Sequence, residues 1–291
     1  MALTINTNMA SMLVQRNMNA STNALNQAIQ RMTTGYKINS AKDDAAGMAV
    51  AIKLDTQLGA YDVAAQNVQM GSSLLTTLEE NDNLVLGHMQ RIRDLAEQAA
   101  NGVYDSSSTS AITAEIDARI AEIDRLSGSV EFNGIKLLDG HIGSTGASQT
   151  TLNIQVGING GSNDVINIAG SMGSVTATSL LTATYKTSGA VVASLAGTAA
   201  ERQDVFDKID AGINALKSKI TAIGSYQNRL DSAAESIEVA RSNLSSALST
   251  VRDADVSTES SNYIKAQILQ QAAASLLTTA NQSPSIALNL I

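Results

Sequence analysis

The chain has 291 residues, 44% of them hydrophobic, and a formal net charge of −8. That length can bury one large or two smaller cores. The acidic balance argues against nucleic acid or an anionic membrane as the main partner. Cysteine is absent, which excludes disulfides, thiolate metal sites and cysteine nucleophiles.

The composition favours long helices over a deep pocket. There is one Pro to interrupt a helix, and there are only two Phe and no Trp to line a thick core. Residues 1–8 lack the basic start, long apolar stretch and cleavage site of a classical signal peptide. No apolar run reaches the roughly 18 residues that a membrane span needs. We therefore expect neither a membrane span nor export by a classical signal.

Residues 1–42 and 253–291 are patterned as helices but are poor in charge. No Asp or Glu precedes Asp43, and nothing after Lys265 is charged. A helix with scarcely a charge on any side is unusual in water, so we expect burial between like subunits, with an ordinary pair of core helices as the alternative. The apolar positions at helical spacing are Met18, Leu25, Ile29, Met32, Ile264, Ile268 and Leu276.

Residues 43–140 predict two helices. A heptad pattern runs from Leu54 to Ala99 and stops at Asn101-Gly102, a pair typical of a helix end. A second amphipathic helix, with apolar positions from Ile112 to Leu126, follows the N-cap candidates that begin at Asp105. The heptad positions are Leu54, Tyr61, Ala64, Val68, Gly71, Leu75, Leu78, Asp82, Val85, Met89, Ile92, Ala96 and Ala99.

Residues 141–200 change in character and are rich in Gly, Ser and Thr. Apolar residues alternate with polar ones from Leu152 to Ile158 and again at Ile166 and Ile168, which predicts a β-hairpin. The stretch 175–199 is expected to form two more short strands or a loop.

Residues 201–252 carry the longest pattern, with 3–4 spacing from Ile209 to Val251 that passes through Leu230, Ala234 and Ile237. A seam of this length specifies coiled-coil packing. The sequence thus predicts a mainly α fold: a long antiparallel coiled-coil or helical-bundle rod built from both chain ends, with a small β-hairpin region at the centre.

Chemistry-bearing residues give no catalytic, cofactor or metal site. His88 and His141 lack metal-ligand spacing, and a lone helical histidine is most often a surface residue. The acidic pairs Asp43-Asp44 and Asp253/Asp255 are better explained as helix caps and contacts between segments than as metal or acid–base pairs.

Specific strings resemble the bacterial flagellins. They are NTN at 6–8, QRN at 15–17, KINSAKDDAAG at 37–47, QRIRDLAEQAANG at 90–102, FNG at 132–134, IQVG at 154–157, QNRL at 227–230, RDAD at 252–255, QILQQ at 267–271 and ANQ at 280–282. Together they cover about the first 160 and last 85 residues.

The resemblance implies an inner filament-core domain from 1–42 and 253–291. It also implies a rod domain from 43–140 and 201–252, with a short tip at 141–200. The low-charge apolar positions given above would then form the polymer core. Inter-domain or assembly contacts would come from Asn39, Ser40, Asp43, Asp44, Arg252, Asp253 and Asp255.

The resemblance also implies a secreted subunit that polymerises with itself into the extracellular flagellar filament. Implied partners are the flagellar type III export apparatus, a flagellin chaperone, the filament cap and the hook–filament junction proteins. No cofactor, nucleic acid or membrane is implied.

Flagellins that resemble this chain are ligands of Toll-like receptor 5. The matching positions are Gln90, Arg91, Leu95, Gln98 and Glu115. Arg91, Leu95 and Gln98 are spaced 4 and 3 and so share a helix face, which also suits packing against a neighbouring subunit. Glu97 adjoins this face at a position where relatives place an aliphatic residue.

Two other classes stay open beside the filament subunit. A hook–filament junction protein has similar ends but a Pro in the Asp-Asp segment, where this chain has Ala45-Ala46-Gly47. A secreted helical translocator requires apolar segments long enough to enter a membrane. No constellation of side chains supports an enzyme.

Overall fold

The structure is a computed structural model that describes residues 8–140, 152–181, 188–195 and 197–288. The chain divides into two compact units. One, the terminal unit, joins Met1–Leu58 with Ser242–Ile291, and the other, the central unit, spans Gly59–Arg241.

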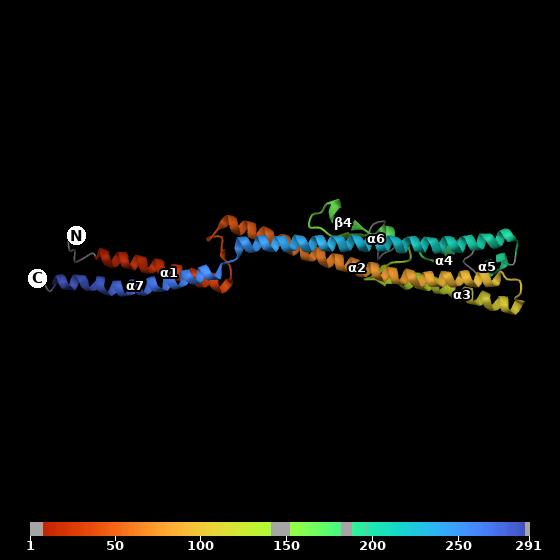
Figure 1. Ribbon diagram of the computed structural model, residues 1–291, viewed down its shortest axis with the longest axis horizontal. Helices are drawn as coiled ribbons and strands as arrows, with labels where there is room; N and C mark the ends of the chain where they lie inside the picture. The colour runs from red at the N-terminus through yellow and green to blue at the C-terminus, as the bar shows by residue number, and fades with distance from the viewer. Residues whose placement is uncertain (1–7, 141–151, 182–187, 196, 289–291) are drawn as a thin grey trace. The chain divides into compact units, whose positions relative to one another are not determined.

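The terminal unit contains two long helices that lie side by side, α1 (Met9–Thr34) and α7 (Val256–Leu288) (Figure 1). Asn8 caps the start of α1, where its side-chain oxygen accepts a hydrogen bond from the Ser11 amide at 3.0 Å. Gly35 ends the helix with a φ of 76°, a left-handed conformation that glycine adopts without strain.

The central unit is built on α2 (Ala45–Ala99), α3 (Ser106–Ser129) and α6 (Ala199–Arg252), of which α2 and α6 continue into the terminal unit. The predicted stop at Asn101-Gly102 and the predicted N-cap at Asp105 are confirmed, since α2 ends at Ala99 and the Asp105 carboxylate accepts from the Ser108 amide. The predicted seams form one apolar core, whose most deeply buried members include Leu75, Leu78, Met89, Ile92, Ile116, Ile123, Leu216, Ile223 and Leu230.

The seam of α6 departs from the predicted register between Leu230 and Ile237. Ala234 is exposed, and Ala233 packs against the core instead. Both residues lie between two buried positions seven apart, and a step of three satisfies helical geometry as well as a step of four.

Two short antiparallel hairpins accompany the helices. β1 (Glu131–Phe132) pairs with β2 (Ile135–Lys136), and β3 (Asn153–Gln155) pairs with β4 (Val165–Asn167). The second pair confirms the predicted hairpin, with Ile154 opposite Ile166 and both side chains buried. Short 3₁₀ turns η1 (Ser162–Asp164) and η2 (Ala169–Ser171) flank β4.

The expectation of two more short strands or a loop at 175–199 is wrong in the residues that the structure describes, which exclude 182–187 and 196. This stretch contains α4 (Ala177–Leu181) and α5 (Ser188–Leu195), both of which pack on α3. At the start of α4 the Thr176 hydroxyl accepts from the Ser179 amide at 3.3 Å, and the Ala177 amide donates to the Asp124 carboxylate of α3, 53 positions away, at 2.8 Å. Local propensity could not reveal that contact.

The predicted mainly α fold, with small strand pairs in the middle of the chain, is confirmed. Within the described ranges no helix is long and apolar enough to span a membrane. Residues 141–151, at the start of the predicted tip, lie outside the described part of the chain.

Candidate functional site

The helices α1 and α7 meet through their smallest side chains. Ala28 of α1 and Ala266 and Ala273 of α7 are the buried apolar residues of the pair, with exposed fractions of 2%, 4% and 7%. Alanine lets two helix backbones approach closely but buries little apolar area. The sequence analysis did not predict these buried positions, because it considered only large apolar side chains. The spacing of seven residues between Ala266 and Ala273 indicates that both lie on one face of α7.

The large apolar side chains of the pair point away from this contact. Met18 and Leu25 are half-buried, and the other predicted polymer-core residues are exposed, up to 59% at Ile268. The two helices expose five further large apolar residues that the prediction did not include: Met9, Met12 and Leu13 on α1, and Val256 and Leu269 on α7. Large apolar side chains exposed in this number on one pair of helices favour an interaction site.

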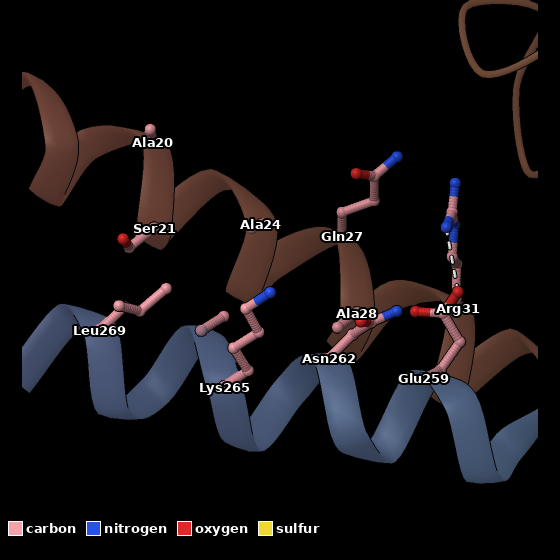
Figure 2. A pocket seen from close by; sticks show the side chains of 11 residues that line it. Ala20, Ser21, Ala24, Gln27, Ala28, Arg31, Glu259, Asn262, Lys265 and Leu269 are labelled. Carbon is pink, nitrogen blue, oxygen red and sulfur yellow. Dashed lines mark hydrogen bonds and ion pairs between the residues drawn. The ribbon is translucent and has the colours of Figure 1, made fainter.

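A groove of about 370 Å³ runs between the two helices. Residues of both helices line it, among them Ala24 and Ala28 of α1 and, opposite them, Lys265 and Leu269 of α7 (Figure 2). At one end the Arg31 Nη1 atom donates to the Glu259 Oε1 atom at 3.0 Å. Glu259 is 7% exposed, so this ion pair is largely shielded from water.

Polar contacts also fix the register of α1 on α7. The Asn8 side chain donates to the Ala280 carbonyl at 2.8 Å, and the Gln270 side chain donates to the Thr22 hydroxyl at 3.0 Å. Together with the Arg31–Glu259 pair, these bonds are distributed along the helices. They specify one alignment, which a contact made of alanines alone would not do.

The ends of α1 and α6 are joined by a short backbone ladder. Tyr36 and Asp253 form an antiparallel bridge, in which the Lys37 amide donates to the Arg252 carbonyl at 2.7 Å. The Arg252 guanidinium lies 3.9 Å from the centre of the Tyr36 ring, a cation–π contact. Arg252 and Asp253 were predicted to make contacts between segments, and the structure places both in this ladder.

The remaining acidic residues of that prediction accept local hydrogen bonds, Asp43 in the turn before α2, and Asp44 and Asp255 at the starts of helices. The Asp43 carboxylate accepts from the Asn39 and Ser40 amides and from the Ser40 hydroxyl, which holds the pKa of Asp43 below its ordinary value, chiefly through the hydroxyl. Asp44 accepts from the Gly47 amide at 2.9 Å at the start of α2. The last one, Asp255, accepts from the Thr258 hydroxyl and Ser257 amide at the start of α7, and both lower its pKa.

The predicted receptor positions lie on α2 and α3 in the central unit. Arg91 Nε donates to Glu115 Oε1 at 2.9 Å across the two helices, and this hydrogen bond raises the pKa of Arg91 and lowers that of Glu115. Gln90 and Gln98 are exposed, and Gln98 donates to the Tyr104 hydroxyl at 3.1 Å. Leu95, predicted to share a contact face with Arg91 and Gln98, is 1% exposed and belongs to the core.

Glu97 has its own partner. Its carboxylate accepts from Arg93 Nη1 at 2.9 Å, one helical turn earlier. Arg93 also donates to Asp210 of α6 at 3.1 Å and lies 4.5 Å from the centre of the Phe206 ring. The negative charge of Glu97 is therefore compensated by Arg93, which also contacts α6.

In the described ranges, no group of three or more His, Asp or Glu side chains is placed to hold a metal ion. What the described structure does offer is a helical chain whose paired terminal helices expose an apolar, charge-poor surface. Such a surface is typical of a subunit that associates with other protein chains.

Two family models locate the chain among known proteins. Residues 5–142 match the bacterial flagellin N-terminal helical region, and residues 206–291 match the bacterial flagellin C-terminal helical region. The flagellin of Bacillus subtilis is 34% identical over 301 residues, with 99% of each chain covered. The flagellar filament 30.7 kDa core protein of Treponema maltophilum is 32% identical over 288 residues, again with 99% of each chain covered.

The chain belongs to the bacterial flagellin family, which is a family of structural proteins and not of enzymes. A solved structure from Vibrio parahaemolyticus, described as a candidate flagellar hook-associated protein, is similar in fold with a TM-score of 0.59. It covers 72% of this chain and all of its own, at 16% identity. Flagellins polymerise into the flagellar filament, an extracellular structure, and family membership favours that role over the hook–filament junction or translocator alternatives.

Proposed function

We propose that α1 and α7 together form the surface by which this flagellin subunit is held in the core of the filament. The observation that carries the proposal is the inverted packing of the pair, with alanines inside and Met, Leu and Ile outside. Burying one such side chain contributes about 1.5–3 kcal/mol. Several per subunit, repeated along a polymer, supply a large driving force for association.

Scarcity of charge on these helices supports the same role. Arg31 and Glu259, two of the few charged residues there, neutralise each other within one subunit. A neighbouring chain could then cover the pair without leaving either charge unpaired, which is the costly outcome in a buried interface. Beside this surface Asp43 accepts hydrogen bonds from Asn39 and Ser40 in the turn before α2, and Asp44 caps the start of α2.

The experiment compares filament formation by wild type, Ile268→Ser/Leu276→Ser and the control Ser275→Ala. The two apolar residues are exposed on α7, and Ser275 lies on the same helix next to Leu276. We expect the double variant to stay in the supernatant at concentrations where wild type and control sediment as filaments. Equal critical concentrations for all three chains would contradict the proposed surface.

We further propose that the chain leaves the cell through the flagellar type III export apparatus, with help from a flagellin chaperone, and meets the filament cap and the hook–filament junction proteins as it assembles. Family membership supports these partners. The route is tested by locating the chain in wild-type cells and in cells that lack the export gate. We expect it outside the wild-type cells and inside the cells without the gate.

A second proposed function is recognition of the monomer by Toll-like receptor 5 through Gln90, Arg91, Gln98 and Glu115. The supporting observation is the Arg91–Glu115 pair, in which a planar guanidinium is held at the surface of two helices with its side chain 47% exposed. Such a preorganised arginine suits an interface hot spot. Leu95 has no direct place in this proposal, since its side chain is buried.

A further inference from the structure

The core of the central unit contains a carboxylate in a position that suits an apolar side chain. Asp82 lies on α2 between the seam residues Leu78 and Val85 and is 0% exposed, as they are. Neither of its oxygens accepts a hydrogen bond from the described residues. A buried polar group without partners is among the more destabilising features a core can contain.

The nearest compensating charge comes from α6 but is engaged elsewhere. Lys219 donates from Nζ to the Ser174 carbonyl at 3.1 Å, and the Ser179 hydroxyl donates to the same oxygen at 2.9 Å. Lys219 therefore acts on Asp82 through its field alone. One turn before Asp82, Glu79 is tied to α6 by a hydrogen bond from Gln227 at 2.9 Å.

The balance of these effects favours the neutral acid. Burial raises the pKa of Asp82 to about 6. The positive charge of Lys219 lowers this pKa, but by less than burial raises it. Burial also lowers the pKa of Lys219, against a raising effect from Asp82. Both groups shift toward their uncharged forms, so desolvation outweighs their mutual attraction.

We propose that Asp82 is a proton-sensitive switch in the core of the central unit, where α2 and α6 pack tightly when its carboxyl takes up a proton and loosen when it is charged. The step is simple proton uptake: a solvent proton bonds to one Asp82 oxygen, and Lys219 keeps its bond to the Ser174 carbonyl. The charged carboxylate cannot be accommodated dry, so opening of the seam gives it access to water.

The direction of the pH effect follows from linkage. The pKa of Asp82 is higher in the folded chain than its ordinary value of 3.8, so the folded state binds the additional proton. Above the pKa that Asp82 has in the folded chain, the charged carboxylate destabilises the fold in full. As the pH falls through that pKa, the carboxyl takes up its proton and the destabilisation disappears. Between pH 7.5 and 5.0 the folding equilibrium constant should rise about tenfold, equivalent to about 1.4 kcal/mol.

The test measures hydrogen exchange of the full-length chain at pH 7.5 and 5.0, corrected for the intrinsic rate, in peptides from α2 and α6 that cover residues 75–89 and 212–227. Monomer is verified by sedimentation. Wild type is compared with Asp82→Asn, which cannot ionise, and with Glu80→Gln, a control that removes an exposed carboxylate two positions away. Every other ionisable group of wild type is also present in Asp82→Asn, so the comparison isolates Asp82.

We expect the opening equilibrium of wild type and Glu80→Gln to fall about tenfold at pH 5.0, and that of Asp82→Asn to change much less. An equal pH response in wild type and Asp82→Asn would overturn the proposal. Should Asp82→Asn fail to fold, a carboxyl ¹³C NMR titration of the wild-type chain decides. A midpoint for Asp82 near its ordinary value would refute the switch, and a midpoint clearly above 5 supports it.

Discussion

Arg91 of α2 and Glu115 of α3 form an ion pair at 2.9 Å, and their side chains remain 47% and 36% exposed. The pair links two helices whose packed faces are apolar. Arg119 reaches the same carboxylate from one turn along α3, at 3.6 Å. Arg91 is thus held in one orientation while most of its donors stay available to another molecule.

Arg91→Ala should weaken binding of the monomer to the Toll-like receptor 5 ectodomain. An interface arginine of this kind often contributes more than about 2 kcal/mol, or roughly thirtyfold in affinity. The fold should hardly change, because an exposed ion pair contributes little to stability and alanine favours helix. Surface plasmon resonance measures the affinity, and circular dichroism measures the helix content.

Two further variants separate the causes. Glu115→Gln frees Arg91 from its partner and should weaken binding less than Arg91→Ala does. Glu97→Val removes a carboxylate that is already compensated by Arg93, so we expect little change in affinity. Tight binding by wild type and Arg91→Ala alike would contradict the assignment; binding by Glu97→Val alone would show that Glu97 blocks recognition.

Leu230→Ala should destabilise the central unit. Leu230 is 0% exposed in the α6 seam, and a buried Leu→Ala change costs about 2–5 kcal/mol. Ser232→Ala is the control, since Ser232 is exposed and its hydroxyl donates only to the Asn228 carbonyl of its own helix. Thermal unfolding of the monomer should show a clear loss at residue 230 alone. Comparable losses at both positions would mean that Leu230 is not a core residue.

Periodicity predicted the long helices because each buries one continuous stripe. The seam from Ala64 to Ala96 and the run from Ile112 to Leu126 needed no more than their spacing. The helices α4 and α5 escaped prediction because they are short, and the start of α4 depends on Asp124, far away in the sequence. Short segments receive their structure from packing, which a local pattern does not contain.

The candidate sites divide in the same way. Asp44 and Asp255 could be predicted as caps, and Asp43 as a contact within its turn, because such hydrogen bonds act within three or four residues. Leu95 could not be placed correctly, since a helix face identifies neighbours but not which neighbour meets water. The Arg31–Glu259 pair joins positions 228 residues apart, and its single hint was how few charges the termini contain.

Arg31→Met should loosen the terminal unit more than the double change Arg31→Met/Glu259→Met does. The single change leaves the 7%-exposed Glu259 without its cation, whereas the double change removes both charges. Hydrogen bonds to charged groups contribute about 1.5–3 kcal/mol, so the single variant should lose protection by about tenfold or more. Hydrogen exchange of α1 peptides from the full-length chain measures this.

Arg16→Met is the matched control for that comparison, because Arg16 is an exposed residue of the same helix. It should leave exchange in α1 unchanged within about twofold, as an exposed charge contributes little. If the single Arg31 change and the double change lose equal protection, the two side chains are not coupled and the ion pair does not fix the register of α1 on α7.

The glycines of α6 give a test of close packing in the central unit. A Cβ added at Gly212 would lie 2.6 Å from the Leu180 carbonyl oxygen and 2.8 Å from Met89 Cε, whereas one added at Gly224 would meet nothing within 4 Å. Gly224→Ala should therefore stabilise the helix by about 0.5–1 kcal/mol, since alanine has less backbone freedom to lose. Gly212→Ala should destabilise by about 1–3 kcal/mol, because the α4 backbone must move. Urea unfolding of the two monomers measures both effects, and a gain in stability at Gly212 would show that α4 does not pack against α6 as described.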